Sequence, residues 1–334
     1  MRTAVMGLGS WGTAFGMVLA DAGNEVVLCG RNDDLAQTIT RSHQNPQFHP
    51  GISLPESITA TTDAAAALSA ADIVVLAIPS QSLRENLVRW QPMLPAGAVV
   101  VSLMKGLEVG TLARMSQVIT EVGHVAAERV AVLSGPNLAG EIALRQPAAS
   151  VVACLDHTVG EAIQRASQTK YFRPYTNADV VGVELGGVVK NVIALATGMA
   201  EGMGFGDNSK AAIMTRGLAE MTRLGVAMGA DPMTFMGLAG IGDLVATCSS
   251  PLSRNRTFGE NLGRGMSMEE VLAITSQTAE GVSSSSAVLQ LARAHQVDMP
   301  ITEHVAGVAH GGRSPRDMVR SLMSRVAKPE WQPS

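Results

Sequence analysis

The stretch Thr3-Ala-Val-Met-Gly-Leu-Gly-Ser-Trp-Gly12 decides the fold class, because an apolar run passes directly into the pattern G-x-G-x-x-G. The run predicts a buried strand, and the residues after the pattern predict a helix. In such a turn Gly7 allows the sharp bend, Gly9 lets a phosphate approach bare backbone, and Gly12 lets helix and strand pack closely. The phosphate would lie at the positive end of the helix. A glycine turn without a ligand is the alternative, but the strand-turn-helix context favours a dinucleotide-binding site.

Three further residues near this turn are candidate cofactor contacts. Ser10 and Trp11 lie in the turn itself, although Trp11 could equally be a packing aromatic. A second strand-like run, 25–29, leads into Arg31 and Asn32, where an acidic residue is typical of NAD-binding sheets. Arg31 would instead attract the 2′-phosphate of NADP(H), unless it is an ordinary solvated arginine. The sequence therefore favours NADP(H), with NAD(H) as the alternative.

Short β-branched runs alternate with helical patterns through the first half of the chain. Strand-like runs follow at 72–78, 98–103, 130–133 and 150–154, and helical patterns lie at 13–22, 33–41, 82–90 and 111–122. These strand-like runs are continuously apolar, which is typical of strands buried on both faces. The alternation predicts an α/β fold with a doubly wound, Rossmann-type parallel sheet. The three prolines of 45–55 predict an ordered loop rather than a central strand.

From about residue 180 the rhythm changes to long patterns rich in Ala, Leu, Met and Gly. They lie at 184–201, 210–229, 268–275, 284–295, 301–310 and 315–326. Because 334 residues exceed what one hydrophobic core usually supports, we expect two domains. The first is a dinucleotide-binding, Rossmann-type domain at 1–179, and the second is a mainly α-helical substrate-binding and catalytic domain at 180–334.

Composition and charge narrow the function classes. Apolar residues make up 46% and charged residues 16% of the chain, as in a compact globular protein. A formal charge of −4 argues against nucleic acid or an anionic membrane as a partner. Three cysteines without C-x-x-C and seven histidines without H-x-x-x-H predict no disulfide framework and no metal site, which fits a reducing cytoplasm. The longest apolar candidate, 180–200, contains Glu184 and Lys190, so we expect no membrane span.

Lys190 and Asn191 lie in the middle of the apolar helical stretch 186–196, and Glu184 and Gly187 share their side of the helix. An ammonium buried among Val, Ile and Ala is strongly unfavourable unless it is paired, and it commonly loses its proton. Lys190 is therefore a candidate general base toward a substrate hydroxyl. The alternative is a lysine whose stem packs on the core while its amine reaches water, which would leave Asn191 as a second unexplained polar residue.

Two polar clusters follow predicted strands. Lys105 comes after the run 98–103 and should stand at the carboxyl edge of the sheet, where open α/β folds bind ligands. The segment Ser134-Gly-Pro-Asn137 follows 130–133 and offers backbone N–H groups to an anion or a carbonyl. Ordinary turn chemistry explains that tetrapeptide equally well.

A third cluster lies in the second half of the chain. The glycine-rich stretch 237–243 predicts a flexible loop that ends in Asp243, a carboxylate able to balance or orient Lys190. Thr247 follows, and then the triplet Ser253-Arg-Asn255, whose arginine is a fork-shaped anion receptor suited to a phosphate monoester. Taken alone, the stretch could be a surface loop. Beside Lys190 and a dinucleotide fold, it indicates a substrate pocket.

A series of motifs runs through both halves of the chain. In order they are G-L-G-S-W-G (7–12), M-K-G-L-E (104–108), S-G-P-N (134–137), L-G-G-V-V-K-N-V (185–192), R-G-L-A-E-M (216–221), G-D-L-V-A-T-C (242–248), S-R-N (253–255) and E-G (280–281). With them the chain resembles the bacterial NAD(P)-dependent glycerol-3-phosphate dehydrogenases over essentially its whole length. The resemblance implies reversible hydride transfer between NAD(P)H and dihydroxyacetone phosphate, giving sn-glycerol 3-phosphate for glycerophospholipid synthesis. It also implies a cytoplasmic homodimer.

The resemblance further implies roles for individual residues. Lys190 would be the proton acceptor and donor, in a catalytic network with Lys105, Asn191, Asp243 and Thr247. Substrate contacts carry over to Lys105, Gly135, Asn137, Lys190, Asp243, Ser253, Arg254 and Asn255. Cofactor contacts carry over to Ser10, Trp11, Arg31, Asn32, Lys105, Ala139, Arg254, Thr278 and Glu280, beside Gly7, Gly9 and Gly12 of the turn. Asn137 departs from the Thr or Ser that family members usually carry, although an amide can still form a hydrogen bond.

Two other functions fit parts of the pattern. One is a related two-domain dehydrogenase of another hydroxy acid, and the other is a nicotinamide-sensing regulator that binds cofactor without turnover. The sequence lacks the basic face of a DNA-binding sensor. Lys190 and Asp243 also count against the regulator, because a sensor needs no proton-transfer group.

Overall fold

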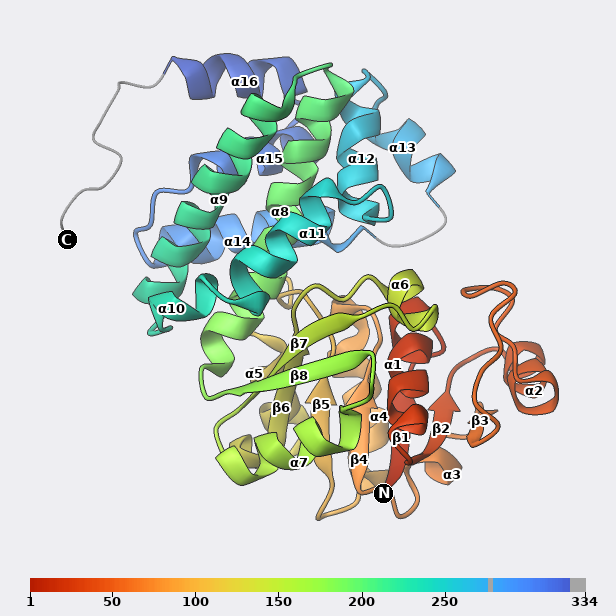
Figure 1. The fold of residues 1–334 in the computed structure, drawn as a ribbon. Coiled ribbons are helices and arrows are strands. Elements are labelled where there is room, and N and C mark those ends of the chain that lie inside the picture. The colour runs from red at the N-terminus through yellow and green to blue at the C-terminus, as the bar shows by residue number, and fades with distance from the viewer. Residues whose placement is uncertain (276–278, 325–334) are drawn as a thin grey trace.

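The computed structural model describes residues 1–275 and 279–324. The first part of the chain is built on one sheet. Its eight strands have the order β3-β2-β1-β4-β5-β6-β7-β8 (Figure 1). They are β1 (Arg2–Met6), β2 (Glu25–Cys29), β3 (Ile58–Thr61), β4 (Ile73–Leu76), β5 (Val99–Ser102), β6 (Val130–Ser134), β7 (Ala148–Cys154) and β8 (Phe172–Asn177). The chain adds β2 and β3 on one side of β1 and then β4 on the other. The predicted doubly wound sheet is confirmed, and its switch point lies between β1 and β4.

The pairing of β6 with β7 differs from the expected parallel sheet. These two strands are antiparallel, while the other neighbouring pairs are parallel. The helix between them, α6 (Ala139–Ala143), has 5 residues and spans about 7.5 Å. A strand such as β6 is roughly 17 Å long. A helix of this length does not return the chain to the opposite edge of the sheet, and β7 runs back against β6.

β3 and β8 are absent from the strand-like runs of the sequence because both lie at the edges of the sheet. β3 has only 4 residues, and β8 contains Pro174 within an alternation of buried and exposed positions. Edge strands tolerate proline and polar residues, since one side of the backbone needs no ladder partner. A search for continuous apolar character therefore misses them.

The helices of this part flank the sheet or connect its strands. They are α1 (Ser10–Asp21), α2 (Asp33–Ser42), α3 (Ala64–Leu68), α4 (Leu83–Trp90), α5 (Met115–Gly123), α6 and α7 (His157–Ser167). Four of them, α1, α2, α4 and α5, lie where the sequence predicts helices, with ends shifted by a few residues. The proline-containing segment 45–55 forms the expected loop, closed by an antiparallel bridge between Gln44 and Ser53.

The second part is helical, as the sequence predicts, and lies against the edge of the sheet where β1 ends (Figure 1). Its helices are α8 (Val180–Gly202), α9 (Asp207–Ala227), α10 (Pro232–Phe235), α11 (Asp243–Ser249), α12 (Arg254–Gly263), α13 (Met268–Ile274), α14 (Glu280–Ala294), α15 (Pro300–Gly311) and α16 (Pro315–Met323). A π-helical turn, Leu238–Gly242, leads directly into α11.

The expected flexible glycine loop at 237–243 is wrong, because this stretch is helical and runs on into α11 and α12. Glycines bring the backbones of α8 and α12 together. A Cβ added to Gly198 would lie 2.0 Å from the Arg256 carbonyl oxygen, and one added to Gly259 would lie 2.2 Å from the Leu195 carbonyl oxygen. Tertiary packing, rather than local propensity, therefore holds α12 in place.

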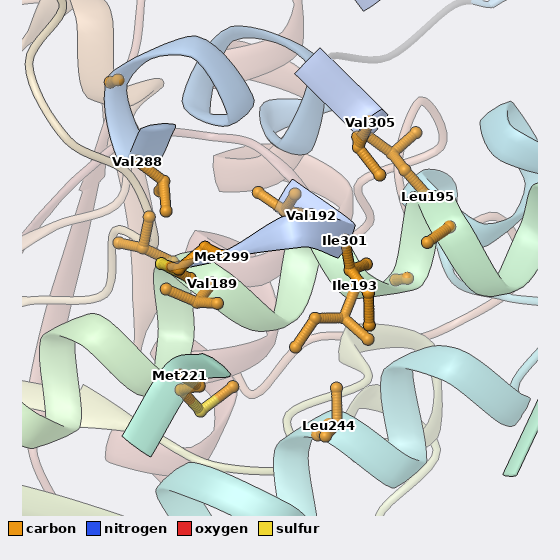
Figure 2. Packing of buried hydrophobic residues seen from close by; sticks show 14 of the residues in the cluster. Val189, Val192, Ile193, Leu195, Met221, Leu244, Val288, Met299, Ile301 and Val305 are labelled. Atoms are coloured by element: carbon orange, nitrogen blue, oxygen red, sulfur yellow. The ribbon is translucent and has the colours of Figure 1, made fainter. Parts of the chain in front are cut away.

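α8 is the central helix of the second part. Val189, Val192 and Ile193 on α8 belong to one buried cluster with residues of the surrounding helices, among them Met221 and Val305 (Figure 2). α8 is long and apolar enough to cross a membrane, but 94% of its apolar window is buried inside the protein. It is a core helix, and the polar residues that it carries are consequently buried as well.

Candidate active site

The glycine turn joins β1 to α1 at the switch point of the sheet. Gly7 has a φ of +135°, and an added Cβ would lie 2.3 Å from the Ala77 carbonyl oxygen, so only glycine fits beside the end of β4. A Cβ added to Gly12 would lie 2.4 Å from the Gly7 carbonyl oxygen, whereas at Gly9 the same position has nothing within 4 Å. Among the described residues no side chain caps the N-terminus of α1. Open backbone before an uncapped helix end fits the phosphates of a dinucleotide.

Ser10 and Trp11 form the first turn of α1. The Trp11 ring packs 5.6 Å from the ring of Phe15, and in the described part of the chain its Nε1 is buried without a partner. A buried N–H group without an acceptor is unfavourable. A bound ligand could supply the acceptor that Trp11 Nε1 lacks. The Ser10 carbonyl oxygen lies 2.8 Å from His49 Nε2 of the proline-containing loop.

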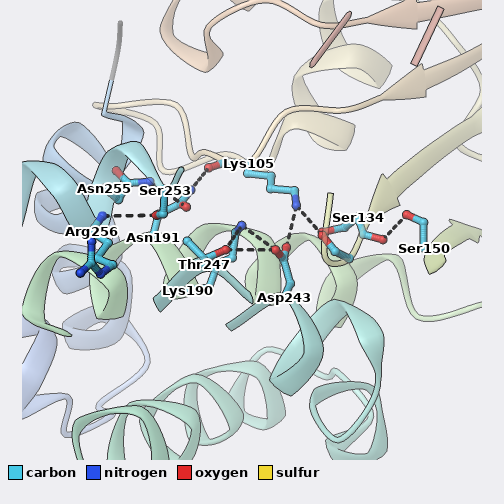
Figure 3. A network of polar contacts seen from close by, with 11 residues as sticks. Lys105, Ser134, Ser150, Lys190, Asn191, Asp243, Thr247, Ser253, Asn255 and Arg256 are labelled. Atoms are coloured by element: carbon cyan, nitrogen blue, oxygen red, sulfur yellow. Dashed lines mark hydrogen bonds and ion pairs between the residues drawn. The ribbon is translucent and has the colours of Figure 1, made fainter. Parts of the chain in front are cut away.

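Three charged side chains meet where α8, α11 and the loop after β5 converge (Figure 3). Lys190 Nζ donates to Asp243 Oδ1 at 2.6 Å and to Thr247 Oγ1 at 2.7 Å. Lys105 Nζ donates to Asp243 Oδ2 at 2.6 Å and to the Gly135 carbonyl oxygen at 3.0 Å. The side chain of Lys190 is only 8% exposed, so the alternative in which its amine reaches bulk water is wrong. Two amines share one carboxylate, and the cluster is positive when both are protonated.

The surroundings of Lys105 lower its pKa to about 8. Burial is the largest cause, because a low dielectric disfavours the charged amine, and the positive charge of Lys190 acts in the same direction. The carboxylate of Asp243 opposes this lowering. Lys105 therefore titrates near neutral pH, where it can hold or release a proton.

A chain of amides links this cluster to two other elements, α12 and α14. Asn191 Nδ2 donates to the Lys105 carbonyl oxygen at 3.2 Å, and Asn191 Oδ1 accepts from Asn255 Nδ2 at 2.9 Å. Asn255 Oδ1 in turn accepts from the Gly281 N–H at 2.9 Å. The backbone that carries Lys105 is thus tied through α8 and α12 to the start of α14. The amide of Asn191 positions Lys105, and the amide of Asn255 positions Asn191.

Comparisons with known proteins show the family of the chain. Residues 2–160 match the family model of the NAD-dependent glycerol-3-phosphate dehydrogenase N-terminus, and residues 179–320 match the model of its C-terminus. The chain belongs to this family. The glycerol-3-phosphate dehydrogenase (NAD(P)+) of Streptomyces griseus subsp. griseus is 63% identical over 330 residues, covering 99% of this chain and 98% of that relative. The enzyme of the same name from Thermobifida fusca is 61% identical over 330 residues and covers 98% of both chains.

The family also matches in three dimensions. The crystal structure of glycerol-3-phosphate dehydrogenase from Coxiella burnetii superposes with a TM-score of 0.92 at 35% sequence identity, covering 97% of this chain and 98% of that one. The resemblance predicted from the motifs is therefore confirmed, and both halves of the glycerol-3-phosphate dehydrogenase fold are present.

The glycerol-3-phosphate dehydrogenase motifs also single out Ser253, Arg254, Asn137 and Thr278. Ser253 caps α12, because its Oγ accepts from the Arg256 N–H at 3.3 Å. Arg254 is exposed at the start of α12, and its guanidinium makes no hydrogen bond or ion pair within the described residues. Both polar atoms of the Asn137 amide are buried without a partner in the described structure. Thr278 lies outside the described residues.

The remaining cofactor candidates follow strand ends or begin helices. Arg31 is exposed after β2, and Asn32 caps α2 by accepting from the Leu35 N–H at 3.0 Å. Ala139 is the first residue of α6. Glu280 begins α14, and its Oε1 accepts from the Ser80 N–H at 3.3 Å and from Ser80 Oγ at 3.0 Å.

Sequence reasoning missed Ser80, which lies just after β4 at the same carboxyl edge as Lys105. Open α/β folds bind ligands at the carboxyl ends of their strands, which is the rule that singled out Lys105. Ser80 also follows a strand end, so the same rule could have identified it. Helical spacing places Glu184 on the side of Lys190, but its hydrogen-bond partners belong to another element. Its carboxylate instead accepts from the Ser116 N–H at 2.8 Å and pairs with Arg114 at the start of α5.

No group of three or more His, Cys, Asp and Glu side chains able to hold a metal ion occurs within 1–275 and 279–324. The three cysteines are buried and unbridged.

Proposed function

We propose that this chain catalyses reversible hydride transfer between NAD(P)H and dihydroxyacetone phosphate, with sn-glycerol 3-phosphate as the reduced partner. The observation that carries the proposal is the pair of buried amines, Lys105 and Lys190, on the single carboxylate of Asp243. An excess of positive charge inside a protein is unfavourable unless an anion joins it. A phosphorylated carbonyl compound supplies both the anion and an oxygen that can take a proton.

In this proposal Lys190 moves the proton. During oxidation its Nζ, held between Asp243 Oδ1 and Thr247 Oγ1, accepts the proton of the substrate hydroxyl. During reduction the protonated amine stabilises the charge that develops on the carbonyl oxygen and then protonates it. Lys105 adds a second positive charge from the opposite side of the carboxylate. The nicotinamide, when bound, supplies and receives the hydride.

The dinucleotide would bind at the glycine turn. Gly7, Gly9 and Gly12 leave its backbone open, and Ser10 and Trp11 lie in the first turn of α1. We propose NADP(H) as the preferred form, since the exposed guanidinium of Arg31 at the end of β2 suits a 2′-phosphate. Asn32, Lys105, Ala139, Arg254, Thr278 and Glu280 complete the proposed cofactor contacts.

The phosphate of the substrate would bind at the start of α12. Arg254 projects an uncommitted guanidinium there, beside Ser253 and Asn255. Bidentate bonds from arginine suit a phosphate monoester, and anchoring far from the reacting carbon improves positioning. Gly135 and the unpartnered amide of Asn137 are the proposed contacts on the sheet side.

Several wider expectations belong to the same proposal. The division into a dinucleotide-binding domain at 1–179 and a catalytic domain at 180–334 is part of it, and the change from strands to helices at the start of α8 supports this boundary. A cytoplasmic homodimer that feeds glycerophospholipid synthesis is what the family resemblance implies.

The test is an assay of NADPH oxidation with dihydroxyacetone phosphate, run beside non-phosphorylated keto acids. We expect turnover with the phosphorylated substrate, and a loss of at least about 100-fold in kcat for Lys190→Met, which keeps the volume of the side chain but removes the amine. Lys170→Met, at an exposed position, is the matched control. Turnover with only non-phosphorylated substrates would indicate another hydroxy-acid dehydrogenase. Binding of NADPH without oxidation of any tested substrate would indicate a cofactor sensor.

A further inference from the structure

The loop between α2 and β3 reaches back to the glycine turn through two buried side chains. We call residues 43–54 the clamp loop. It is closed on itself by the Leu54 N–H, which donates to the His43 carbonyl oxygen at 2.8 Å, and by the bridge between Gln44 and Ser53. The segment contains no helix or strand. Its side-chain contacts with the glycine turn therefore indicate what the segment does.

The clamp loop holds the turn by its carbonyl groups. Asn45, which is fully buried, donates from Nδ2 to the Leu8 carbonyl oxygen at 3.0 Å and to Thr13 Oγ1 at 2.8 Å. His49, which is 3% exposed, has its Nε2 at 2.8 Å from the Ser10 carbonyl oxygen. Because a carbonyl oxygen can only accept, His49 Nε2 carries the proton in this bond. Both contacts flank Gly9, the residue with open space in front of its backbone.

Peptide planarity passes this restraint on to the N–H groups of the turn. The carbonyl of Leu8 and the N–H of Gly9 belong to one rigid plane, and so do the carbonyl of Ser10 and the N–H of Trp11. In a trans peptide the two groups point in opposite directions. Holding the two oxygens from the side of the clamp loop therefore aims both N–H groups away from it.

We propose that Asn45 and His49 are positioning residues for dinucleotide binding, which fix the Leu8–Gly9 and Ser10–Trp11 peptide planes before the ligand arrives. The inference rests on the proposed function in that the ligand is a nicotinamide dinucleotide. It assigns the contribution of the clamp loop to affinity for the cofactor, not to the chemical step. Preorganised donors lose less free energy on binding than donors that must be ordered by the ligand.

The experiment compares two substitutions at one position. His49→Leu keeps the bulk of the side chain and loses the donor, whereas in His49→Gln the amide nitrogen can take the place of Nε2. By isothermal titration calorimetry with NADPH alone, we expect the Kd to rise about five- to tenfold for His49→Leu and to stay within about twofold of the wild type for His49→Gln. The KM for dihydroxyacetone phosphate should not change in either variant. Gln47→Leu, at an exposed position of the same loop, is the control.

Three results would overturn the inference. They are an unchanged Kd in His49→Leu, an equal loss in His49→Gln, and a parallel rise in the KM for the triose phosphate. If thermal unfolding shows that His49→Leu does not fold, Asn45→Ala removes the restraint on Leu8 instead and should weaken NADPH binding in the same way. A wild-type chain that binds NADPH without oxidising it would refute the proposed function and leave this inference to be decided by the same titrations.

Discussion

Replacing Asp243 with asparagine tests whether the shared carboxylate organises the two amines. Its side chain is 1% exposed and accepts one charge-assisted bond of 2.6 Å from each lysine. An asparagine amide offers only one oxygen, so its NH₂ group must face one of the two amines. Asp243→Asn therefore removes the counter-charge of both ammonium groups and leaves at least one of them without its acceptor.

The size of the effect follows from this geometry. Removing one partner of a buried ion pair costs about 3–5 kcal/mol. If about 3 kcal/mol of this is lost from the transition state, kcat/KM for dihydroxyacetone phosphate falls roughly 100-fold. The variant also removes the charge that opposes the lowered pKa of Lys105, so any alkaline fall in activity should move below about pH 8.

The assay is NADPH oxidation followed from about pH 6 to about pH 9, together with calorimetric titration of NADPH. We expect the Kd for NADPH to change less than about threefold, which would show that the dinucleotide site is intact. Asp231→Asn is the matched control, since Asp231 caps α10 through the Met233 N–H and asparagine caps equally well. Activity of Asp243→Asn within about threefold of the wild type would refute the reasoning, because neither lysine would then depend on the carboxylate.

Three further predictions concern single positions. Gly9→Val should leave the thermal unfolding temperature nearly unchanged, because the added side chain meets open space, yet abolish detectable NADPH binding in a titration; normal binding would contradict the placement of the phosphates. In the wild type, the KM for dihydroxyacetone phosphate should rise above about pH 8 as Lys105 loses its proton, and a pH series on Lys105→Met should lack that rise. Burial raises the pKa of Glu220 from 4.5 to about 7, so the folded state binds this proton more tightly than the unfolded state. The stabilisation from this group is present below about pH 4.5, and about 3 kcal/mol of it is lost as the pH rises through 7. Urea titrations should show this decline in the free energy of unfolding for the wild type and a smaller decline for Glu220→Gln.

The parts of the site that sequence reasoning reached are those with a local signal. The glycine turn consists of consecutive residues, so its position and the helix that follows it could be predicted from the sequence. Lys190 stood out because a charge in an apolar helix breaks the pattern, and Lys105 because it follows a strand end. Each of these inferences needs only one element of secondary structure.

The parts that sequence reasoning missed depend on contacts between distant segments. The helix α12 is polar and contains two glycines, and it is held by close packing on α8. His49 lies far along the chain from Ser10, and nothing in the spacing of the two residues indicates that they meet. The bond between Ser80 and Glu280 joins the two halves of the chain. Such pairs become visible only when the topology is known.

The arrangement of the cluster explains why so many polar groups hold Lys105 in place. Its amine lies near a second positive charge, and the lowered pKa shows that the folded protein disfavours its charged form. A free side chain would relieve this by turning toward water. Asn191 prevents the backbone from moving, and the Gly135 carbonyl and Asp243 hold the amine. The folded protein thus keeps an unfavourable charge distribution that an anionic substrate would relieve, so part of the binding free energy of the substrate is already stored before it enters.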